Sequence, residues 1–341
     1  MKTTTATLLA LLFAVSVCWG QKPDWLSGKS SKYPNEFYLV GVGAGKTRDV
    51  AENQARASIA KTFSADISAV TGVVTTETIA QKDQTVTADL SQKTVSDIEV
   101  GVNKTLEGTE IADVWEDRET GTVHALAVLD RSAAQSILEE QIRQKDEEIL
   151  HLSTSVGEIS QKLEKLRIML RQNSLMVARE RLNSDCRVVD PMHRGIQAPF
   201  SMEEEKTRIS SFLKNDFKVG VSSSGEESAR LIKPTLKSLS AKGLHARKVT
   251  SSNQNSMDVI IMLESDLDPS TEPVDEWYYC RWQVDMTIID QRDSSSIATD
   301  SRHGRAGQLS AKESRRKAIS EMTRSVAGLS ESVWNTLRGA E

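Results

Sequence analysis

The stretch that most resembles a catalytic motif is Tyr38–Val50, which reads YLVGVGAGKTRDV. An apolar run, a glycine-rich turn, a Lys-Thr pair and a following helix come in the order found in phosphate-binding loops. Such a loop needs a glycine six residues before Lys46, but that position is Val40. A dinucleotide-binding pattern would need glycine at position 46 itself. A nucleotide-dependent enzyme acting through Gly41–Thr47 is therefore a remote alternative.

The second part of a nucleotide site would be a parallel strand that ends in a carboxylate. His124–Asp130 is an apolar run ending in Asp, but a turn signal, Glu119–Gly121, comes directly before it. The residues before that turn, Glu110–Trp115, also read as a short strand. Two strands joined by a tight turn form an antiparallel hairpin, which does not suit a phosphate-binding fold.

The three glycines of the first stretch have a structural explanation. Gly41, Gly43 and Gly45 alternate, so they share one face of a strand and allow a helix to lie close to it. Thr47 is a suitable N-cap for that helix. From Val50 to Ile67, apolar and small residues recur at helical spacing.

The first residues of the chain are typical of an export signal. Lys2 precedes an apolar run, Ala6–Val17, which is too short to cross a bilayer. Cleavage after Gly20 would release a soluble protein and is the favoured prediction. Cleavage before Cys18 would give a lipid-anchored protein, but the residue before Cys18 is valine, where a lipobox has a smaller residue.

Composition excludes several classes of protein. The chain has 341 residues and a formal net charge of −5, without a basic block, which argues against a nucleic-acid partner. Its histidines are scattered and its cysteines have no metal-ligand spacing, so no metal site, cofactor or catalytic residue is predicted. Spacing alone leaves open whether Cys186 and Cys280 form a disulfide.

The N-terminal third resembles a known family. Pro23-Asp24-Trp25, the strand Tyr38–Gly43 and the helix start Ala51-x-x-x-Ala55-x-Ala57 are similar, in order and spacing, to the LPP-twenty family of membrane-associated lipoproteins. The resemblance covers roughly residues 23–130. It implies a compact α+β domain in which a long helix lies against a small antiparallel sheet. It also implies a location in the bacterial cell envelope and no catalytic residues.

A heptad pattern runs through residues 131–185 and predicts one long helix. This helix could self-associate as a coiled coil, or it could pack within its own chain as a single helix or a helical hairpin. A soft spot at Ser153–Gly157 weakens its continuity. The predicted self-association seam comprises Ile149, Leu152, Val156, Ile159, Leu163, Leu166 and Leu170.

Residues 186–341 predict a second α+β domain. Patterns of apolar residues, turns and caps indicate a set of alternating helices and strands. The predicted helices are Met202–Asp216, Ser228–Gly243 and Ala311–Leu337, and the predicted strands are Phe217–Val221, Val259–Leu263, Trp277–Ile289 and Ile297–Arg302.

Candidate ligand contacts occur only in this last region. Trp277 and Tyr279 fall on the outward side of their strand, where they can stack on a polymer. His303, beside Arg302 and Arg305, suggests an anion site, although a surface turn is the favoured interpretation. An acidic stretch could hold Ca²⁺ weakly, but a solvated loop suits its spacing better: Asp258, Glu264, Asp266, Asp268, Glu272, Asp275 and Glu276.

These observations predict an α+β protein with two small domains, each with helices on a mostly antiparallel sheet. A signal peptide (1–20), the first domain (21–130), the long helix (131–185) and the second domain (186–341) make up the chain. We expect a non-enzymatic protein of the periplasm or outer membrane that acts in binding or assembly; the alternative is a binding module for an envelope polymer such as peptidoglycan. Its expected partners are envelope proteins or peptidoglycan, with a homo-oligomer formed through the long helix, and a membrane only if Cys18 is lipidated.

Overall fold

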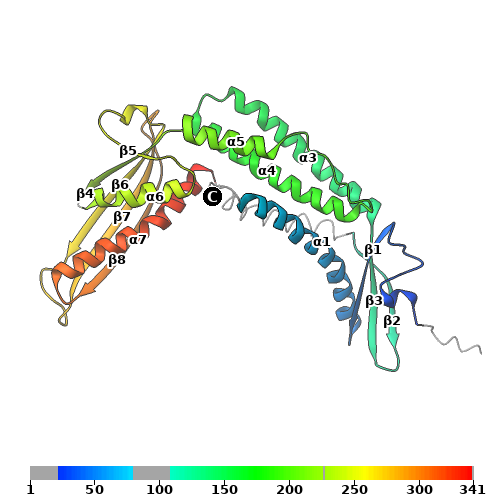
Figure 1. Ribbon diagram of the computed structural model, residues 1–341. Coiled ribbons are helices and arrows are strands. Elements are labelled where there is room, and N and C mark those ends of the chain that lie inside the picture. Colours follow the sequence, from blue (N-terminus) through cyan, green and yellow to red (C-terminus); the bar gives the residue numbers. More distant parts are fainter. Residues whose placement is uncertain (1–21, 80–107, 226, 340–341) are drawn as a thin grey trace, which may run out of the picture. The chain divides into compact units, whose positions relative to one another are not determined.

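The computed structural model describes residues 22–79, 108–225 and 227–339 (Figure 1). The chain divides into two compact units. The N-terminal unit comprises Met1–Thr62 and Leu106–Ser132, and the C-terminal unit comprises Phe63–Thr105 and Ala133–Glu341. Both contain helices and mainly antiparallel sheets, which confirms the predicted α+β class.

The N-terminal unit is built on a three-stranded antiparallel sheet of order β1-β3-β2. A 3₁₀ turn at Asp24–Ser27 precedes it, and the long helix α1 follows its first strand. The hairpin predicted from the turn at Gly121 is confirmed, since β2 and β3 pair antiparallel. The elements are β1 (Tyr38–Gly45), α1 (Arg48–Ile79, which belongs to this unit as far as Thr62), β2 (Glu110–Asp117) and β3 (Thr122–Asp130).

Helix α1 covers one face of this sheet, and the glycines of β1 allow it to lie close. A Cβ atom on Gly43 would collide with the backbone of Ala51 and Ala55, and one on Gly41 with the carbonyl of Ala55. Thr47 caps the helix as predicted, and its hydroxyl accepts from the amide of Val50 at 3.4 Å. The opposite face is closed by buried Trp25.

Residues 131–185, predicted as one helix, form two helices. Helix α3 spans Arg131–Glu158 and helix α4 spans Lys162–Val189. Glu148 pairs with Arg171 and Asp146 with Arg179, so the helices run antiparallel as a hairpin. The continuous-helix prediction is wrong because the chain leaves helical geometry just beyond the soft spot at Gly157, whereas the hairpin alternative is confirmed.

The C-terminal unit also contains a five-stranded sheet of order β5-β4-β6-β7-β8. Strand β4 runs parallel to β5 and β6, and the other neighbours are antiparallel. Helices α6 and α7 contact each other and lie on the same face (Figure 1). The elements are α5 (Met202–Ser211), a π-helical turn (Phe212–Asp216), β4 (Val219–Gly225), α6 (Ile232–Ala241), β5 (Arg247–Lys248), β6 (Val259–Pro269), β7 (Tyr278–Asp290), β8 (Ser296–Gln308) and α7 (Ala311–Leu337).

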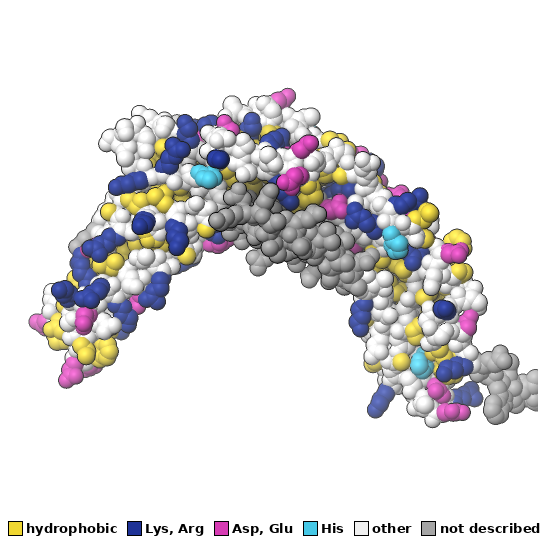
Figure 2. Space-filling view, viewed as in Figure 1, with side chains coloured by type: hydrophobic (Ala, Val, Ile, Leu, Met, Phe, Trp, Pro, Cys, Tyr) yellow, Lys and Arg dark blue, Asp and Glu magenta, His cyan; other side chains and the backbone are white. Residues whose placement is uncertain are grey.

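The core of this unit lies between the sheet and the helices. Alternation along β7 buries Cys280, Trp282, Val284, Met286 and Ile288, as predicted. The indole of Trp282 donates to Glu321 of α7 at 3.1 Å, which identifies this face as the one that α7 covers. On the solvent side of the helices, Lys and Arg side chains gather (Figure 2).

Two segments that the sequence predicted to be a loop and a turn belong to strands. Strand β6 continues through Pro269, so Glu264, Asp266 and Asp268 lie on a strand and not in a solvated loop. Apolar Leu267 is buried between the last two carboxylates, which explains why the chain stays extended. Similarly, His303 lies within strand β8 and not in a surface turn. Among the described residues, no helix is both long and apolar enough to cross a membrane.

Candidate functional site

The candidate site lies on the face of the five-stranded sheet opposite α6 and α7. Strand pairing places Tyr279 beside Gly307, Arg281 beside Arg305 and Gln283 beside His303. It also places Asp268 beside Arg281 and Asp266 beside Gln283. Since residues paired across antiparallel strands share a face, these side chains form one surface. A polar, solvated face of this kind is compatible with an antiparallel sheet.

A strained turn presents Trp277 at one end of this surface. Val274 and Trp277 exchange two backbone hydrogen bonds, of 2.8 and 3.0 Å, around Asp275 and Glu276. Both central residues have positive φ, 49° and 66°, as a type I′ turn requires. Non-glycine residues adopt this conformation at an energetic cost, so the rest of the fold must hold them there.

This end of the sheet exposes apolar surface. Val274 is 59% exposed, Trp277 43% and Leu309 65%. Leu309 directly follows Gln308, the register partner of Tyr278, and thus lies at the same end as the turn. Large apolar side chains gathered in this way commonly mark a binding surface.

Tyr279 connects this end to the charged part of the face. Gly307 leaves space above β8 that the ring of Tyr279 occupies, since a Cβ there would meet the ring at 2.9 Å. The guanidinium of Arg305 lies 4.2 Å from the centre of the same ring. This cation–π contact holds both side chains in one orientation before any ligand arrives.

Beyond Tyr279 lies a depression with a volume of about 540 Å³, which we call the charged depression. Strand alternation turns the side chain of Trp282 to the other face, so its backbone forms the floor together with that of Gly304. Carboxylates stand on β6 and cationic groups on β7 and β8. Its lining is Asp266, Asp268, Arg281, Trp282, Gln283, His303, Gly304 and Arg305.

The sequence identified parts of this site but not their proximity. Trp277 and Tyr279 were predicted as ligand contacts, and both lie on the open face. The acidic stretch and His303 were taken as separate, solvated segments, yet the sheet brings Asp266 and His303 into one depression. Arg281 was missed as a site residue. Its one signal was its outward position in the alternation of β7.

The glycines that resemble a phosphate-binding loop pack against a helix of the fold. Gly41 and Gly43 face α1, and β1 pairs antiparallel with β3 along its whole length. Lys46 is exposed at the start of the helix. The glycine spacing is therefore explained by helix packing.

The predicted self-association seam packs largely inside its own chain. Val156, Leu166 and Leu170 belong to the same core as the five-stranded sheet, and Leu163 packs against it. Ile149 is also buried, whereas Leu152 and Ile159 are half-buried. Most of the seam is therefore buried within its own chain, and self-association through it stays a prediction.

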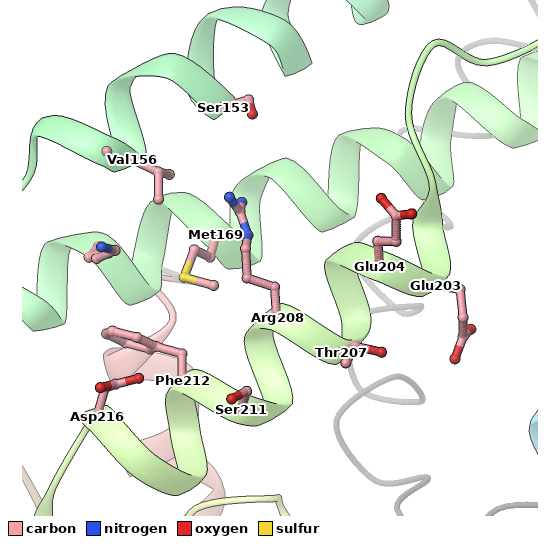
Figure 3. Close-up of a pocket in the computed structure, with 12 residues that line it drawn as sticks. Ser153, Val156, Met169, Glu203, Glu204, Thr207, Arg208, Ser211, Phe212 and Asp216 are labelled. Atoms are coloured by element: carbon pink, nitrogen blue, oxygen red, sulfur yellow. The ribbon is translucent and has the colours of Figure 1, made fainter.

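A second pocket, of about 690 Å³, lies among α3, α4 and α5 (Figure 3). Val156 and Met169 contribute apolar surface, and Arg208 extends from α5 toward Met169. Arg208 is already engaged, since it donates to Gln172 at 2.9 Å and pairs with Glu205 at 2.8 Å. Its guanidinium therefore supports the wall of the pocket.

The structure also bears on the cysteines and on possible metal ligands. Cys186 and Cys280 are both buried and free, so they form no disulfide. Burial raises the pKa of the Cys186 thiol to about 12, which leaves it unreactive. Within the described ranges, no group of three His, Cys, Asp or Glu side chains could hold a metal ion. Cys18 and the signal segment lie outside the described residues.

The fold and this surface define an α+β protein with a small N-terminal sheet and a C-terminal sheet whose outer face is polar. Residues 23–130 match the model of the LPP20 lipoprotein family, which confirms the resemblance seen in the sequence. The match covers the N-terminal third and none of the five-stranded sheet.

Other comparisons are more distant. No curated protein matches the chain. The secreted protein HP1454 from the human pathogen Helicobacter pylori is similar over 86% of this chain and 97% of its own, with 14% identity and a TM-score of 0.41. A putative neuraminyllactose-binding hemagglutinin homolog from Helicobacter pylori covers 36% of this chain and 84% of its own, with 10% identity and a TM-score of 0.24. These two likenesses carry no argument about function.

Proposed function

We propose that this protein is an exported, envelope-associated binding protein without enzymatic activity, and that its C-terminal sheet binds peptidoglycan. The match of residues 23–130 to a lipoprotein family supports the location. The apolar run Ala6–Val17 supports export. Lipidation at Cys18 would add a membrane anchor to the same binding function.

One observation carries the choice of ligand: Trp277 and Tyr279 stand next to each other on an open sheet face, with Arg305 over the ring of Tyr279. Aromatic rings fixed in this way can stack on the apolar faces of sugar rings. The neighbouring charged groups suit the peptide part of the polymer. A glycan strand lying along the sheet face would contact both.

A sedimentation assay tests the proposal with the full mature chain and purified peptidoglycan sacculi. The wild type should sediment with the sacculi, and Trp277→Ala or Tyr279→Ala should weaken binding about tenfold or more, as at other aromatic hot spots. Phe37→Ala is the matched control, because Phe37 is an exposed aromatic residue (62%) in the other unit. It should bind like the wild type.

Two outcomes would contradict the proposal. If the wild type stays in the supernatant, peptidoglycan is not the ligand, and a protein partner at the exposed end of the sheet becomes the better hypothesis. If Phe37→Ala weakens binding as much as Trp277→Ala, the sheet face is not the binding surface.

A further inference from the structure

Two arginines stand directly opposite each other in the charged depression. Arg281 of β7 and Arg305 of β8 are register partners, and His303 lies two residues along β8 on the same face. Like charges in directly opposed positions of an antiparallel pair destabilise it. The sheet therefore carries an unfavourable arrangement that an anionic group would relieve.

The chain compensates this charge only in part. Asp268 reaches Arg281 at 3.7 Å, but the two side chains are 68% and 73% exposed. An ion pair this exposed to water contributes little to stability. Arg305 lies over the ring of Tyr279, a contact that orients its charge without neutralising it. Within the described part of the chain, Arg305 makes no ion pair. A ligand carboxylate placed between the two arginines would compensate the remaining positive charge.

A ligand that carries only negative charge does not match the charges of the whole depression, because Asp266 and Asp268 line its other side. They stand on β6, next to the strand of Arg281, and adjacent strands are about 4.8 Å apart. A polyanion that approached the arginines would also approach these carboxylates. A ligand group that carries an ammonium close to a carboxylate would satisfy both sides.

We propose that the charged depression binds zwitterionic amino-acid groups of the stem peptide, with Arg281 and Arg305 on the carboxylate and Asp266 and Asp268 on the ammonium. This inference rests on the proposed function, since Trp277 and Tyr279 would hold the glycan beside it. The aromatic residues would then supply affinity for the polymer backbone. The charged depression would supply selectivity for free peptide ends.

Three soluble muropeptides test this: one with free amino and carboxyl groups, one acetylated on its amino group, and one amidated on its carboxyl groups. Calorimetric titration of the full mature chain should give the tightest binding for the first, and binding weaker by about fivefold or more for each of the others. Arg281→Gln should abolish the effect of amidation and keep that of acetylation. The double variant Asp266→Asn/Asp268→Asn should abolish the effect of acetylation and keep that of amidation.

Arg302→Gln is the matched control, because Arg302 pairs in register with buried Val284 and so belongs to the opposite face of β8. It should bind all three compounds like the wild type. Circular dichroism of each variant checks that its fold is intact.

Equal affinity of the wild type for the three compounds, lost in Trp277→Ala, would overturn the zwitterion site and leave polymer binding intact. Failure of sacculi and of all three compounds to bind would overturn the proposed function together with this inference. An effect of Arg302→Gln as large as that of Arg281→Gln would also overturn the assignment, because general charge would then explain selectivity.

Discussion

Gly43 of β1 and Ala51 of α1 meet backbone to backbone, with no space for even one additional carbon atom between strand and helix. The glycine-rich stretch that resembles a phosphate-binding loop thus serves a packing contact. The same contact explains why small residues occur on both sides, since Ala51 and Ala55 are completely buried against the strand. If these glycines bound a phosphate, substitutions would impair ligand binding; because they serve packing, substitutions should lower the stability of the fold.

Gly43→Ala should destabilise the protein strongly. The added methyl group collides with backbone atoms of Ala51 and Ala55, which cannot move aside as a flexible side chain could. Overpacking typically costs about 1–3 kcal/mol, and a collision with backbone atoms should bring the loss to the upper end of that range. Urea unfolding monitored by circular dichroism measures the change.

Gly328→Ala is the control for this prediction. Gly328 lies inside helix α7, and a Cβ there meets nothing within 4 Å. The substitution should stabilise the protein by about 0.5–1 kcal/mol, because alanine loses less conformational freedom in a helix. Equal effects at both glycines would show that helix–strand contact is not what Gly43 provides.

Arg179 should be essential for the stability of the helical hairpin. Its completely buried guanidinium pairs with Asp146 at 3.0 Å and donates to the carbonyls of Ile196 and Gln197 at 3.0 and 3.1 Å. Arg179→Met would leave Asp146 without its partner and should cost about 3–5 kcal/mol in urea unfolding.

Arg171→Met provides the comparison on the same helix. Arg171 also pairs with an acidic residue of α3, Glu148 at 2.8 Å, but its side chain is 67% exposed. The loss should stay at about 1 kcal/mol or less, as for other surface ion pairs. Similar losses for the two variants would contradict the role assigned to burial.

Leu170→Ala should lower stability without changing the oligomeric state. Leu170, a member of the predicted self-association seam, is buried in the core that the sheet shares. Removal of its side chain should cost about 2–5 kcal/mol. Leu150→Ala, at a position 49% exposed on α3, should be close to neutral. Light scattering should give one molar mass for both variants and the wild type; a smaller mass for Leu170→Ala would instead support self-association through the seam.

Local patterns predicted much of this fold. The alternation of β7 identified its buried side chains, Thr47 marked the start of α1, and the bounds Ala311–Leu337 of α7 were predicted correctly. The break between α3 and α4 was not predicted, because the heptad pattern itself does not change there; the soft spot at Ser153–Gly157 lies just before it. The hairpin follows from contacts such as Asp146–Arg179, which link residues far apart in the sequence.

The site was harder to predict than the fold because it depends on register. Asp266, Arg281 and His303 lie in three separate sequence segments, and only the pairing of β6, β7 and β8 brings them together. The polar run after Leu263 looked like a loop, since only Leu267 interrupts it with a large apolar side chain. A one-residue shift of β8 would have turned His303 to the other face.

Asp185 should make stability depend on pH near neutrality. This carboxyl group of α4 is 1% exposed, and its Oδ1 has no hydrogen-bond partner among the described residues. Burial raises its pKa to about 7, with Arg181 opposing part of the increase. In the unfolded chain the pKa returns to about 3.9, so between these values only the folded state keeps the proton. Stability contributed by this group is therefore complete below about pH 4 and is lost as pH rises toward 7.

Asp185→Asn isolates this contribution, because asparagine has nearly the same shape and stays neutral. Relative to the wild type, the variant should gain stability as pH rises from 5 to 7, by at most about 1.4 kcal/mol per pH unit, and the difference should level off above pH 7. Urea unfolding at pH 5, 6, 7 and 8 measures it. Asp293→Asn should show no such trend, because the hydroxyl of Ser295 lowers the pKa of Asp293 and both states are ionised throughout that range. A constant difference between Asp185→Asn and the wild type would mean that Asp185 is already ionised in the fold at pH 5.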